Sequence, residues 1–367
     1  MAEYSTVEVR LYPNNDQRVQ LNKTIGCARK IWNLMLGESE EHYKKTGEHR
    51  LLTPAAFKEA YDYLKEVDSL ALANRQLELT KAFKNFFKNK GHFGKPSFKS
   101  KHKSRWSYKT NRVGKNLTYD GHYVKLPKLG RVLCRGGFVP ESGVLKSATV
   151  IRERDGRYYA KLHYQIEREP VAPVAPQRTL GLDYASNGLY VDSEGNSAAM
   201  PRHYHNKQRK LAREQRKLAR KKRGGANYEK QKVAVARVYA KIKNQRKDFL
   251  HKQSTSIAKM YDLVAVEDLN LVALANRGFG NGKATLGNAY GRFVFYLSYK
   301  LSERGKSLVK VDRFYPSSQL CYSCGEKQKM LLSERTYRCP HCGYIEDRDV
   351  NAAKNIEREG LRLALAT

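Results

Sequence analysis

A chain of 367 residues is long enough for two or three domains, since one domain takes about 150 residues. Its 70 lysines and arginines outnumber its 36 aspartates and glutamates, which gives a net charge of +34 at pH 7. This excess favours a polyanionic partner, and we expect nucleic acid. No apolar run approaches the about 18 residues of a membrane span and no signal peptide is recognisable, so we expect no membrane partner and a cytoplasmic protein.

The first half of the sequence predicts a strand, a helical region and then β structure. Residues 6–13 alternate between apolar and polar side chains, which is typical of a strand. Apolar residues at helical spacing over 21–35 predict a helix, and further helices are expected near 54–66 and 71–90. Residues 106–170 are rich in alternating segments and turn signals, and we expect β structure there.

A turn and a boundary are recognisable at the end of this half. Asp155-Gly156 lies between two alternating segments and predicts the turn of a hairpin. Pro170, Pro173 and Pro176 interrupt the chain shortly afterwards. This proline-rich segment predicts a domain boundary.

Residues 88–109 form a basic segment that interleaves lysine, glycine, proline and aromatic residues without a regular period. Such a loop can hold phosphates through its cations while its rings face bases, and it can also be a solvated linker. The number of aromatic residues favours nucleic-acid binding. The candidate binding residues are Lys95, Phe98, Lys99, Lys101, Arg105 and Trp106.

Beyond the prolines, we expect a buried strand that ends near Asp183, a turn and a second strand. Residues 204–252 predict two strongly basic helices joined at Gly224-Gly225. A charged run is usually a solvated face, but charge of one sign this dense would repel itself without a bound polyanion. The candidate nucleic-acid-binding residues here are Arg209, Lys210, Arg216, Lys217, Arg220, Lys221, Lys222, Arg246 and Lys247.

The remainder of the chain predicts a short series of elements before and after the cysteines. Residues 261–267 predict a buried strand that ends at Glu267, and residues 278–288 a flexible glycine-rich connection. A helix over 289–303 and a strand over 307–315 follow. A final helix is expected over 350–358.

Six cysteines are present, and four of them form two CxxC pairs separated by fourteen residues: Cys321 with Cys324 and Cys339 with Cys342. This spacing is typical of a zinc ribbon, in which four thiolates hold one structural zinc ion. Metal-binding thiolates fit a reducing compartment. We expect the two remaining cysteines, Cys27 and Cys134, to be small buried apolar residues.

Three acidic residues stand at the ends of predicted elements. Asp183 and Glu267 end apolar strands, and Asp349 precedes the final helix. A carboxylate at the end of an apolar strand needs a cation or a hydrogen-bond donor. If the three converge, they form a hard oxygen site for Mg²⁺ or Mn²⁺ that would suit phosphodiester cleavage. From the pattern alone a structural role stays open, because a chain with 36 acids offers many triplets.

The succession of motifs is similar to that of a known family. GLDYAS, VAVEDLNL, the two CxxC pairs and DRDVNAAKNI occur in this order, accompanied by ARKIWN, GKPSFKSK and NQRKDFLHK. In order and separation they resemble the RuvC-like nuclease and zinc ribbon of the TnpB family, which are transposon-encoded relatives of type V CRISPR effectors. The likeness extends through most of the chain.

The resemblance implies an α/β fold in which an RNase H-like (RuvC) nuclease domain carries an inserted zinc ribbon. It also implies an N-terminal β-barrel-like wedge domain into which a helical recognition domain is inserted. The implied domains are a wedge at 1–12 and 105–175, a helical recognition domain with the basic loop at 13–104, a nuclease at 177–315 and 346–367, and a ribbon at 316–345.

The resemblance implies an RNA-guided DNA endonuclease of the prokaryotic cytoplasm or nucleoid. Such proteins bind a guide RNA from the transposon end and cut double-stranded target DNA next to a short transposon-adjacent motif, with base pairing reading most of the sequence. The guide sequence, the adjacent motif, the cut positions and the oligomeric state cannot be predicted from this sequence.

Carried over by motif, the family's catalytic triad falls on Asp183, Glu267 and Asp349. The implied cofactors are two catalytic Mg²⁺ ions at these residues, for which Mn²⁺ could substitute, and one structural Zn²⁺. Asp349 is chosen because the family motif is an acid, one residue and then Asn-Ala-Ala; a contribution from Asp347 stays open. Asp268 would point away from Glu267 on a strand, and we expect it to be structural.

Two other functions are compatible with some of these features. A non-cleaving RNA-guided DNA-binding repressor or transposon accessory factor would use the same surface, but all three acidic motifs are intact. A DDE-type transposase needs only acids on a related fold, but cysteine knuckles immediately before the final acid fit it poorly. We therefore predict the nuclease.

Overall fold

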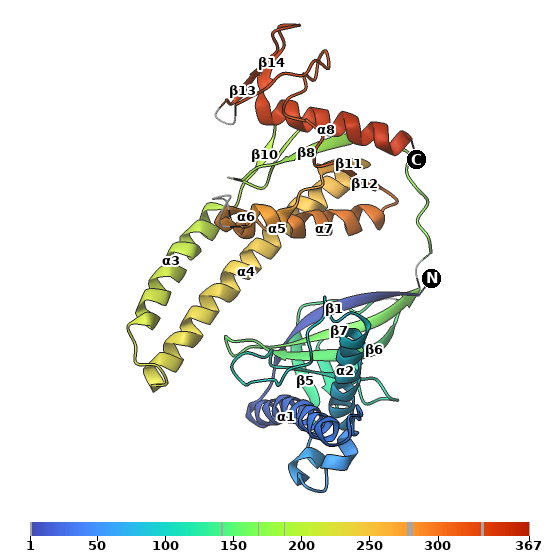
Figure 1. The fold of residues 1–367 in the computed structure, drawn as a ribbon, viewed down its shortest axis with the longest axis vertical. Coiled ribbons are helices and arrows are strands. Elements are labelled where there is room, and N and C mark those ends of the chain that lie inside the picture. Colours follow the sequence, from blue (N-terminus) through green and yellow to red (C-terminus); the bar gives the residue numbers. More distant parts are fainter. Residues whose placement is uncertain are drawn as a thin grey trace. The chain divides into compact units, whose positions relative to one another are not determined.

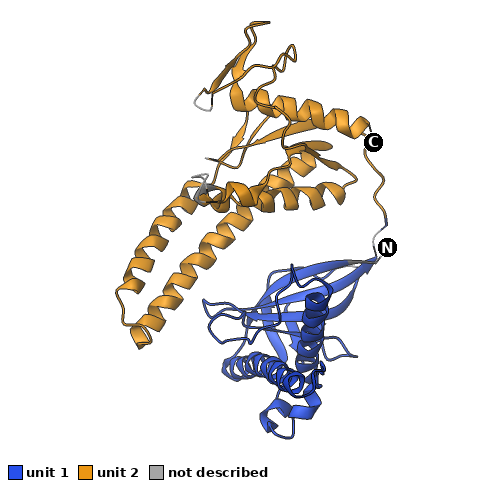
Figure 2. Ribbon diagram, in the orientation of Figure 1, with its two compact units in different colours: residues 1–169 blue, residues 170–367 orange. Residues whose placement is uncertain are grey.

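The structure is a computed structural model that describes residues 2–140, 142–167, 169–186, 188–276, 282–331 and 334–366. The chain forms two compact units, Met1–Glu169 and Pro170–Thr367 (Figure 2). The second unit begins at the first proline of the proline-rich segment. Among the described residues, no helix is long and apolar enough to cross a membrane.

A seven-stranded antiparallel sheet forms the centre of the first unit (Figure 1). Its strands are β1 (Ala2–Tyr12), β2 (Ser107–Asn111), β3 (Thr118–Tyr119), β4 (Tyr123–Leu126), β5 (Gly130–Arg135), β6 (Val144–Arg152) and β7 (Tyr158–Glu167), in the order β2-β6-β7-β1-β5-β4-β3. The strands β6 and β7 form the predicted hairpin, and Gly156 in its turn has a φ of 85°. Because β2 and β3 end the strand order without pairing to each other, the sheet is a curled half-barrel and not a closed barrel.

The helical region of this unit lies between β1 and β2 in the sequence. It comprises α1 (Asn15–Thr46), the 3₁₀ helices η1 (Pro54–Phe57) and η2 (Asp62–Lys65), and α2 (Ser69–Lys88). The first half of α1 packs into the sheet core through Leu21 and Ile25, and its second half packs with α2 in a second core. The prediction of one helix over 54–66 is wrong: two short 3₁₀ helices form there, and Phe57, Tyr61 and Leu64 pack against the second core. Cys27 and Cys134 are buried, as predicted.

The second unit contains a five-stranded mixed sheet. Its strands are β8 (Thr179–Tyr184), β9 (Tyr190–Asp192), β10 (Ser197–Ala198), β11 (Leu263–Glu267) and β12 (Ser307–Val311), in the order β10-β9-β8-β11-β12. The strands β8, β11 and β12 are parallel, whereas β9 and β10 continue from β8 as antiparallel neighbours. The parallel strands therefore end at the same edge of the sheet.

Helices cover both faces of this sheet. The helices of this unit are α3 (Arg202–Ala219), which packs on α4, and then α4 (Ala226–Met260), α5 (Leu271–Leu274), α6 (Gly282–Asn288), α7 (Tyr290–Ser302) and α8 (Arg348–Leu365). Figure 1 shows α8 on one face of the sheet and α7 on the other. Leu182 and Val266 pack in one core with residues of α4 and α7, whereas Leu263 and Ala265 pack in another with Ile356 of α8. Alternation along each strand thus assigns every second residue to the α8 face.

The helix α8 lies unusually close to the sheet because two glycines are at the contact. A Cβ at Gly181 would overlap the carbonyl oxygen of Ala353 and lie 2.7 Å from the amide nitrogen of Glu357. A Cβ at Gly360 would overlap the side chain of Ala265. Only glycine therefore fits at these two positions.

Several predicted boundaries differ from the structure. The final helix runs from Arg348 to Leu365, longer than predicted over 350–358, because its buried face continues to Gly360. The strand predicted over 307–315 ends at Val311, where a turn begins. In the glycine-rich connection, residues 282–288 form α6, and residues 278–281 lie outside the described residues.

Gly181→Ala should destabilise the second unit by about 3 kcal/mol, because the added methyl group forces α8 away from β8. The measurement is calorimetric unfolding of the RNA-free protein. Gly26→Ala in α1 is the control: nothing lies within 4 Å of its Cβ position, so helix propensity should stabilise the first unit by about 1 kcal/mol. Equal stability of Gly181→Ala and wild type would contradict the close packing of α8.

Candidate active site

Two of the predicted acids end adjacent parallel strands. Leu182 pairs with Val266 in the register of β8 and β11, so the next residues, Asp183 and Glu267, lie side by side. Both alternate with residues that face α4 and α7, and therefore point to the α8 face. With Asp349, they line one cavity of about 450 Å³.

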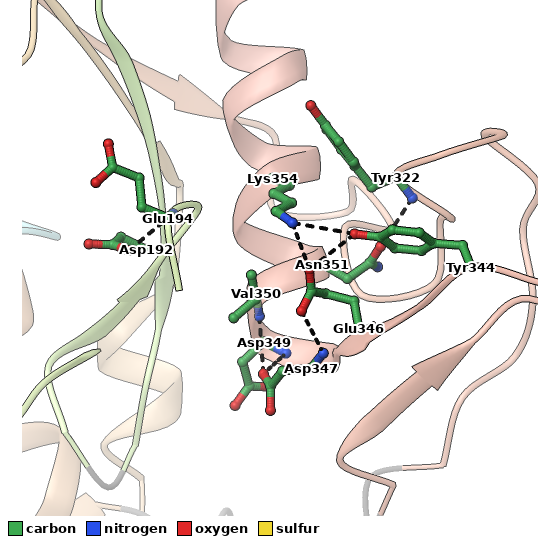
Figure 3. A network of polar contacts seen from close by, with 10 residues as sticks. All are labelled: Asp192, Glu194, Tyr322, Tyr344, Glu346, Asp347, Asp349, Val350, Asn351 and Lys354. Atoms are coloured by element: carbon green, nitrogen blue, oxygen red, sulfur yellow. Dashed lines mark hydrogen bonds and ion pairs between the residues drawn. The ribbon is translucent and has the colours of Figure 1, made fainter. Parts of the chain in front are cut away.

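The third acid comes from the first turn of α8. The carboxylate Oδ1 of Asp349 accepts a hydrogen bond from the guanidinium of Arg348 at 3.0 Å, and its Oδ2 lies 3.7 Å from Nη1 of Arg335. The neighbouring Asp347 has a different task, because its Oδ1 accepts the backbone N–H groups of Asp349 and Val350 at 2.9 and 3.2 Å (Figure 3). Asp347 is thus the N-cap of α8, and the cavity is lined by Asp349.

The three carboxylates repel one another. Burial, followed by the charges of Asp349 and Glu267, raises the pKa of Asp183 to about 8. Burial also raises the pKa of Glu267. All three carboxylates are half-buried, and carboxylate oxygens are the ligand type that a hard divalent cation such as Mg²⁺ prefers.

Other acids near these strands have structural partners. Asp268 binds Nζ of Lys310 at 2.8 Å and Nη2 of Arg313 at 3.0 Å, which is consistent with the structural role expected for it. Asp192 pairs with Leu182 in the sheet and so faces away from α8; its carboxylate accepts backbone N–H groups of the turn that follows.

The four cysteines of the CxxC pairs form one cluster. Their sulfur atoms all lie within 4.8 Å of one another, and Cys321–Cys342 and Cys324–Cys339 are 3.6 Å apart. Four sulfurs at about 2.3 Å from a zinc ion form a tetrahedron with edges of about 3.8 Å, so the cluster fits structural zinc. The strands β13 (Thr336–Arg338) and β14 (Ile345–Asp347) complete this ribbon.

The two knuckles of the ribbon have the same backbone geometry. Gly325 and Gly343 follow the second cysteine of each pair and have φ angles of 80° and 75°. In both knuckles the glycine N–H donates to the carbonyl of the first cysteine, at 2.9 and 3.1 Å. The left-handed turn explains why glycine follows each CxxC.

The ribbon is attached to α8 by two fully buried asparagines. Nδ2 of Asn351 donates to the carbonyl of Leu320 at 2.8 Å, and its Oδ1 accepts the N–H of Tyr322 at 3.0 Å (Figure 3). One turn later, Nδ2 of Asn355 donates to the carbonyls of Ser317 and Leu320. This attachment of the ribbon was not predicted from the sequence, although the i, i+4 spacing of the two asparagines within DRDVNAAKNI places them on one face of a helix.

The basic loop of the first unit is fixed to α1. Nζ of Lys99 lies 3.4 Å from the ring centroid of Trp32, and burial lowers the pKa of Lys99 to about 8. Lys95 pairs with Glu40 at 3.0 Å. The indole of Trp106 donates to the carbonyl of Lys101 and is half-buried. The side chains of Phe98, Lys101 and Arg105 are exposed.

Most of the predicted binding residues of the second unit are exposed on the basic helices. Lys217 pairs with Glu214 at 3.2 Å, and Arg216 donates to the carbonyl of Ala212. Arg246 is half-buried, and its Nη1 donates to the backbone carbonyls of α6. Lys221 is also half-buried, and the exposed residues are Arg209, Lys210, Arg216, Lys217, Arg220, Lys222 and Lys247.

Three family models match the chain. Residues 290–356 match the Cas12f1-like, TNB domain, residues 162–277 a "Probable transposase" model, and residues 3–48 a "Helix-turn-helix domain" model. Within 3–48 the structure contains the strand β1 and one continuous helix, α1.

Two curated relatives match almost the full length of the chain. A "Putative RNA-guided DNA endonuclease" of Streptomyces pristinaespiralis is 35% identical over 367 residues, which cover 96% of this chain and 88% of the relative. The chain belongs to the TnpB/OrfB_IS605 family. A second relative, the "Putative RNA-guided DNA endonuclease InsQ" of Escherichia coli (strain K12), is 29% identical, with 98% of this chain and 93% of the relative covered.

A solved structure has a similar fold. The protein chain in "Cryo-EM structure of the Cas12f1-sgRNA-target DNA complex" superposes with a TM-score of 0.57 at 13% identity, covering 97% of this TnpB-family chain and 99% of that one. The mixed α/β fold therefore resembles Cas12f. The family assignment confirms the resemblance that the motifs indicate in the sequence.

Elemental analysis should find about one zinc ion per chain, because four thiolates close one tetrahedral site. Cys339→Ser should lose this zinc and destabilise the second unit. Cys27→Ala, which removes a buried thiol of the first unit, is the matched control and should retain zinc. Protein purified without a chelator that holds no zinc would refute the ribbon site.

The raised pKa of Asp183 predicts a pH-dependent stability in the absence of Mg²⁺. In the folded chain Asp183 keeps a proton that it releases near about pH 4 in the unfolded chain. The resulting stabilisation of the folded state is complete below about pH 4 and is lost as the pH rises through about 8. Asp183→Asn cannot ionise and should therefore unfold at a higher temperature than wild type at about pH 9. The measurement is thermal unfolding against pH without chelator, so that zinc stays bound.

Asp268→Asn is the control for this titration. Hydrogen bonds from Lys310 and Arg313 hold the pKa of Asp268 below its usual value, so its stabilisation is lost only as the pH falls through that pKa. This variant should keep the wild-type slope near pH 8. If the unfolding temperature of Asp183→Asn also changed with pH as in wild type, another titrating group would be responsible.

Proposed function

We propose that this chain is an RNA-guided DNA endonuclease that cuts target DNA next to a short transposon-adjacent motif. The observation that carries the proposal is the convergence of Asp183, Glu267 and Asp349 on one cavity in a member of the TnpB/OrfB_IS605 family. The names of two relatives state the same activity, and the similar Cas12f1 structure contains a guide RNA and target DNA. The net charge of +34 supports polyanionic partners.

The proposed domains follow the family's organisation. The strand order β10-β9-β8-β11-β12, with three parallel strands and helices on both faces, supports an RNase H-like (RuvC) nuclease at 177–315 and 346–367. The ribbon at 316–345 is its insertion. The half-barrel sheet corresponds to the wedge at 1–12 and 105–175, and the helical region at 13–104 to the recognition domain.

Asp183, Glu267 and Asp349 would hold the catalytic Mg²⁺ ions, or Mn²⁺ in their place. Bound there, the ions would supply an activated water and charge stabilisation at the leaving oxygen of the phosphodiester. The chain itself fixes two of these carboxylates on rigid strands and the third on a helix packed directly against them. Rigid elements of this kind limit how far the three ligands must move when a metal binds.

The cations around the cavity would bind the substrate. Arg313, Lys327 and Arg348 line the same cavity as the acids, and their charges suit the phosphates on either side of the cut. Arg348 also lies against Asp349 and so lowers the repulsion among the carboxylates. The residues predicted in the basic loop and on α3 and α4 would contact guide RNA and target DNA through their phosphates.

The proposal is tested by incubating protein co-expressed with its guide RNA with a plasmid that carries a matched target in a library of adjacent motifs. Wild type should cut in Mg²⁺, and Asp183→Ala, Glu267→Ala and Asp349→Ala should each reduce cutting to background. Target binding without any nicking in Mg²⁺ or Mn²⁺ would instead indicate a non-cleaving DNA-binding protein.

Asp347 provides a matched control two residues from the proposed ligand. Asp347→Asn keeps a side chain that can cap α8 and should retain cleavage, because the carboxylate of Asp347 is used by backbone N–H groups. Loss of cleavage in Asp347→Asn together with retention in Asp349→Ala would reverse the assignment of the third acid.

A further inference from the structure

The turn after β12 is fixed on both sides of Phe314. The carboxylate of Asp312 accepts the N–H of Phe314 at 2.8 Å, and the carbonyl of Asp312 accepts the N–H of Tyr315 at 3.0 Å. Arg313 is bound to Asp268 at the end of β11 at 3.0 Å. The backbone that carries Phe314 therefore has a defined position.

The side chain of Phe314 takes no part in this anchoring. It is 85% exposed, whereas the next residue, Tyr315, packs into the core beneath α8. A single exposed ring needs no explanation by itself. Phe314, however, is one of the residues that line the cavity containing Asp183, Glu267 and Asp349.

The rim of the cavity offers partners for both parts of a nucleotide. Arg313 and Lys327 carry charges that suit phosphate, and Phe314 presents an aromatic face that suits a base. Every nucleobase has a π face, so stacking tolerates any sequence. A nuclease whose target is chosen by a guide must accept any base at its cut, and stacking is the contact that permits this.

We propose that Phe314 stacks on an unpaired base of the DNA strand being cut, next to the scissile phosphate. This subsite rests on the proposed nuclease function and adds a contact that places the phosphate over the three carboxylates. Phe314 is a positioning residue, because it acts on the base and not on the reacting atoms. A base within a duplex is stacked on its neighbours, so the subsite requires the strand to be single-stranded there.

The direct test is photocrosslinking with the full chain and its guide RNA, in an Asp183→Ala background that leaves the strand uncut. The target strand carries 5-iodouracil at successive positions around the mapped cut, and crosslinked peptides are identified by mass spectrometry. We expect a crosslink to Phe314 from a position adjacent to the cut. Crosslinks only to other residues, or a crosslink to Phe314 only from labelled guide RNA, would overturn the proposal.

Cleavage rates in the otherwise wild-type chain give a second test. Phe314→Ala should lower the single-turnover rate about tenfold, as expected for loss of one stacked base, while Phe314→Trp should restore it and Phe314→Leu should not. Phe295→Ala is the control, because Phe295 is 64% exposed and lines a separate cavity on α7. Since Phe314 is exposed, zinc content and thermal stability should not change.

The nuclease function and the stacking subsite can be refuted separately. If wild type does not cut, or Asp183→Ala still cuts, the proposed function fails. If Asp183→Ala is inactive but Phe314→Ala cuts at the wild-type rate, the stacking subsite alone is refuted.

Discussion

Direct packing of α8 on β8 is the contact on which the candidate active site depends. Gly181 lies two residues before Asp183 on the same face of the strand, and the backbone of α8 at Ala353 occupies the space that a side chain there would fill. The helix therefore lies close enough for its first turn to reach the end of β8. The same glycine that permits the packing belongs to the GLDYAS motif that supplies the first acid.

The ribbon extends this arrangement to the other side of α8. Asn351 and Asn355 are fully buried and bind the chain just before and after Cys321. A buried amide left without partners is costly, so the ribbon and the helix stabilise each other's position. Zinc binding by the four cysteines and placement of Asp349 are thus linked through one helix.

At this site, packing brings the three acids together although electrostatic repulsion disfavours that arrangement. Burial of Asp183 beside Glu267 and Asp349 raises its pKa to about 8, which means that the fold tolerates three acids at a place where they repel. Proteins commonly give up stability at functional sites in this way. A bound divalent cation would remove the repulsion, which gives the site a physical reason to bind one.

The sequence was sufficient to predict the elements whose signals are local. The sequence placed Asp183 and Glu267 at the ends of apolar strands, and the structure shows that these strands are adjacent and parallel. The CxxC spacing predicted the cysteine cluster. The choice between Asp347 and Asp349 depended on motif likeness, and the structure adds the physical distinction that Asp347 caps α8.

Features that depend on contacts between distant segments were not predictable. The need for glycine at 181 arises from Ala353 and Glu357, which are more than 170 positions away in the chain. The apolar residues of the stretch 54–66 pack against the second core, but the chain there forms two short 3₁₀ helices, so their spacing did not predict the length or type of helix. Likewise, the sequence of the basic loop does not predict that the ammonium group of Lys99 packs against the ring of Trp32.

The central claim is that three acids from separate segments form one metal site. A crystal of the protein with bound guide RNA and Mn²⁺, measured at the manganese absorption edge, tests it directly. We expect anomalous peaks from manganese ions that are coordinated by carboxylate oxygens of Asp183, Glu267 and Asp349. Manganese bound only elsewhere, or a cavity without any peak at saturating Mn²⁺, would contradict it.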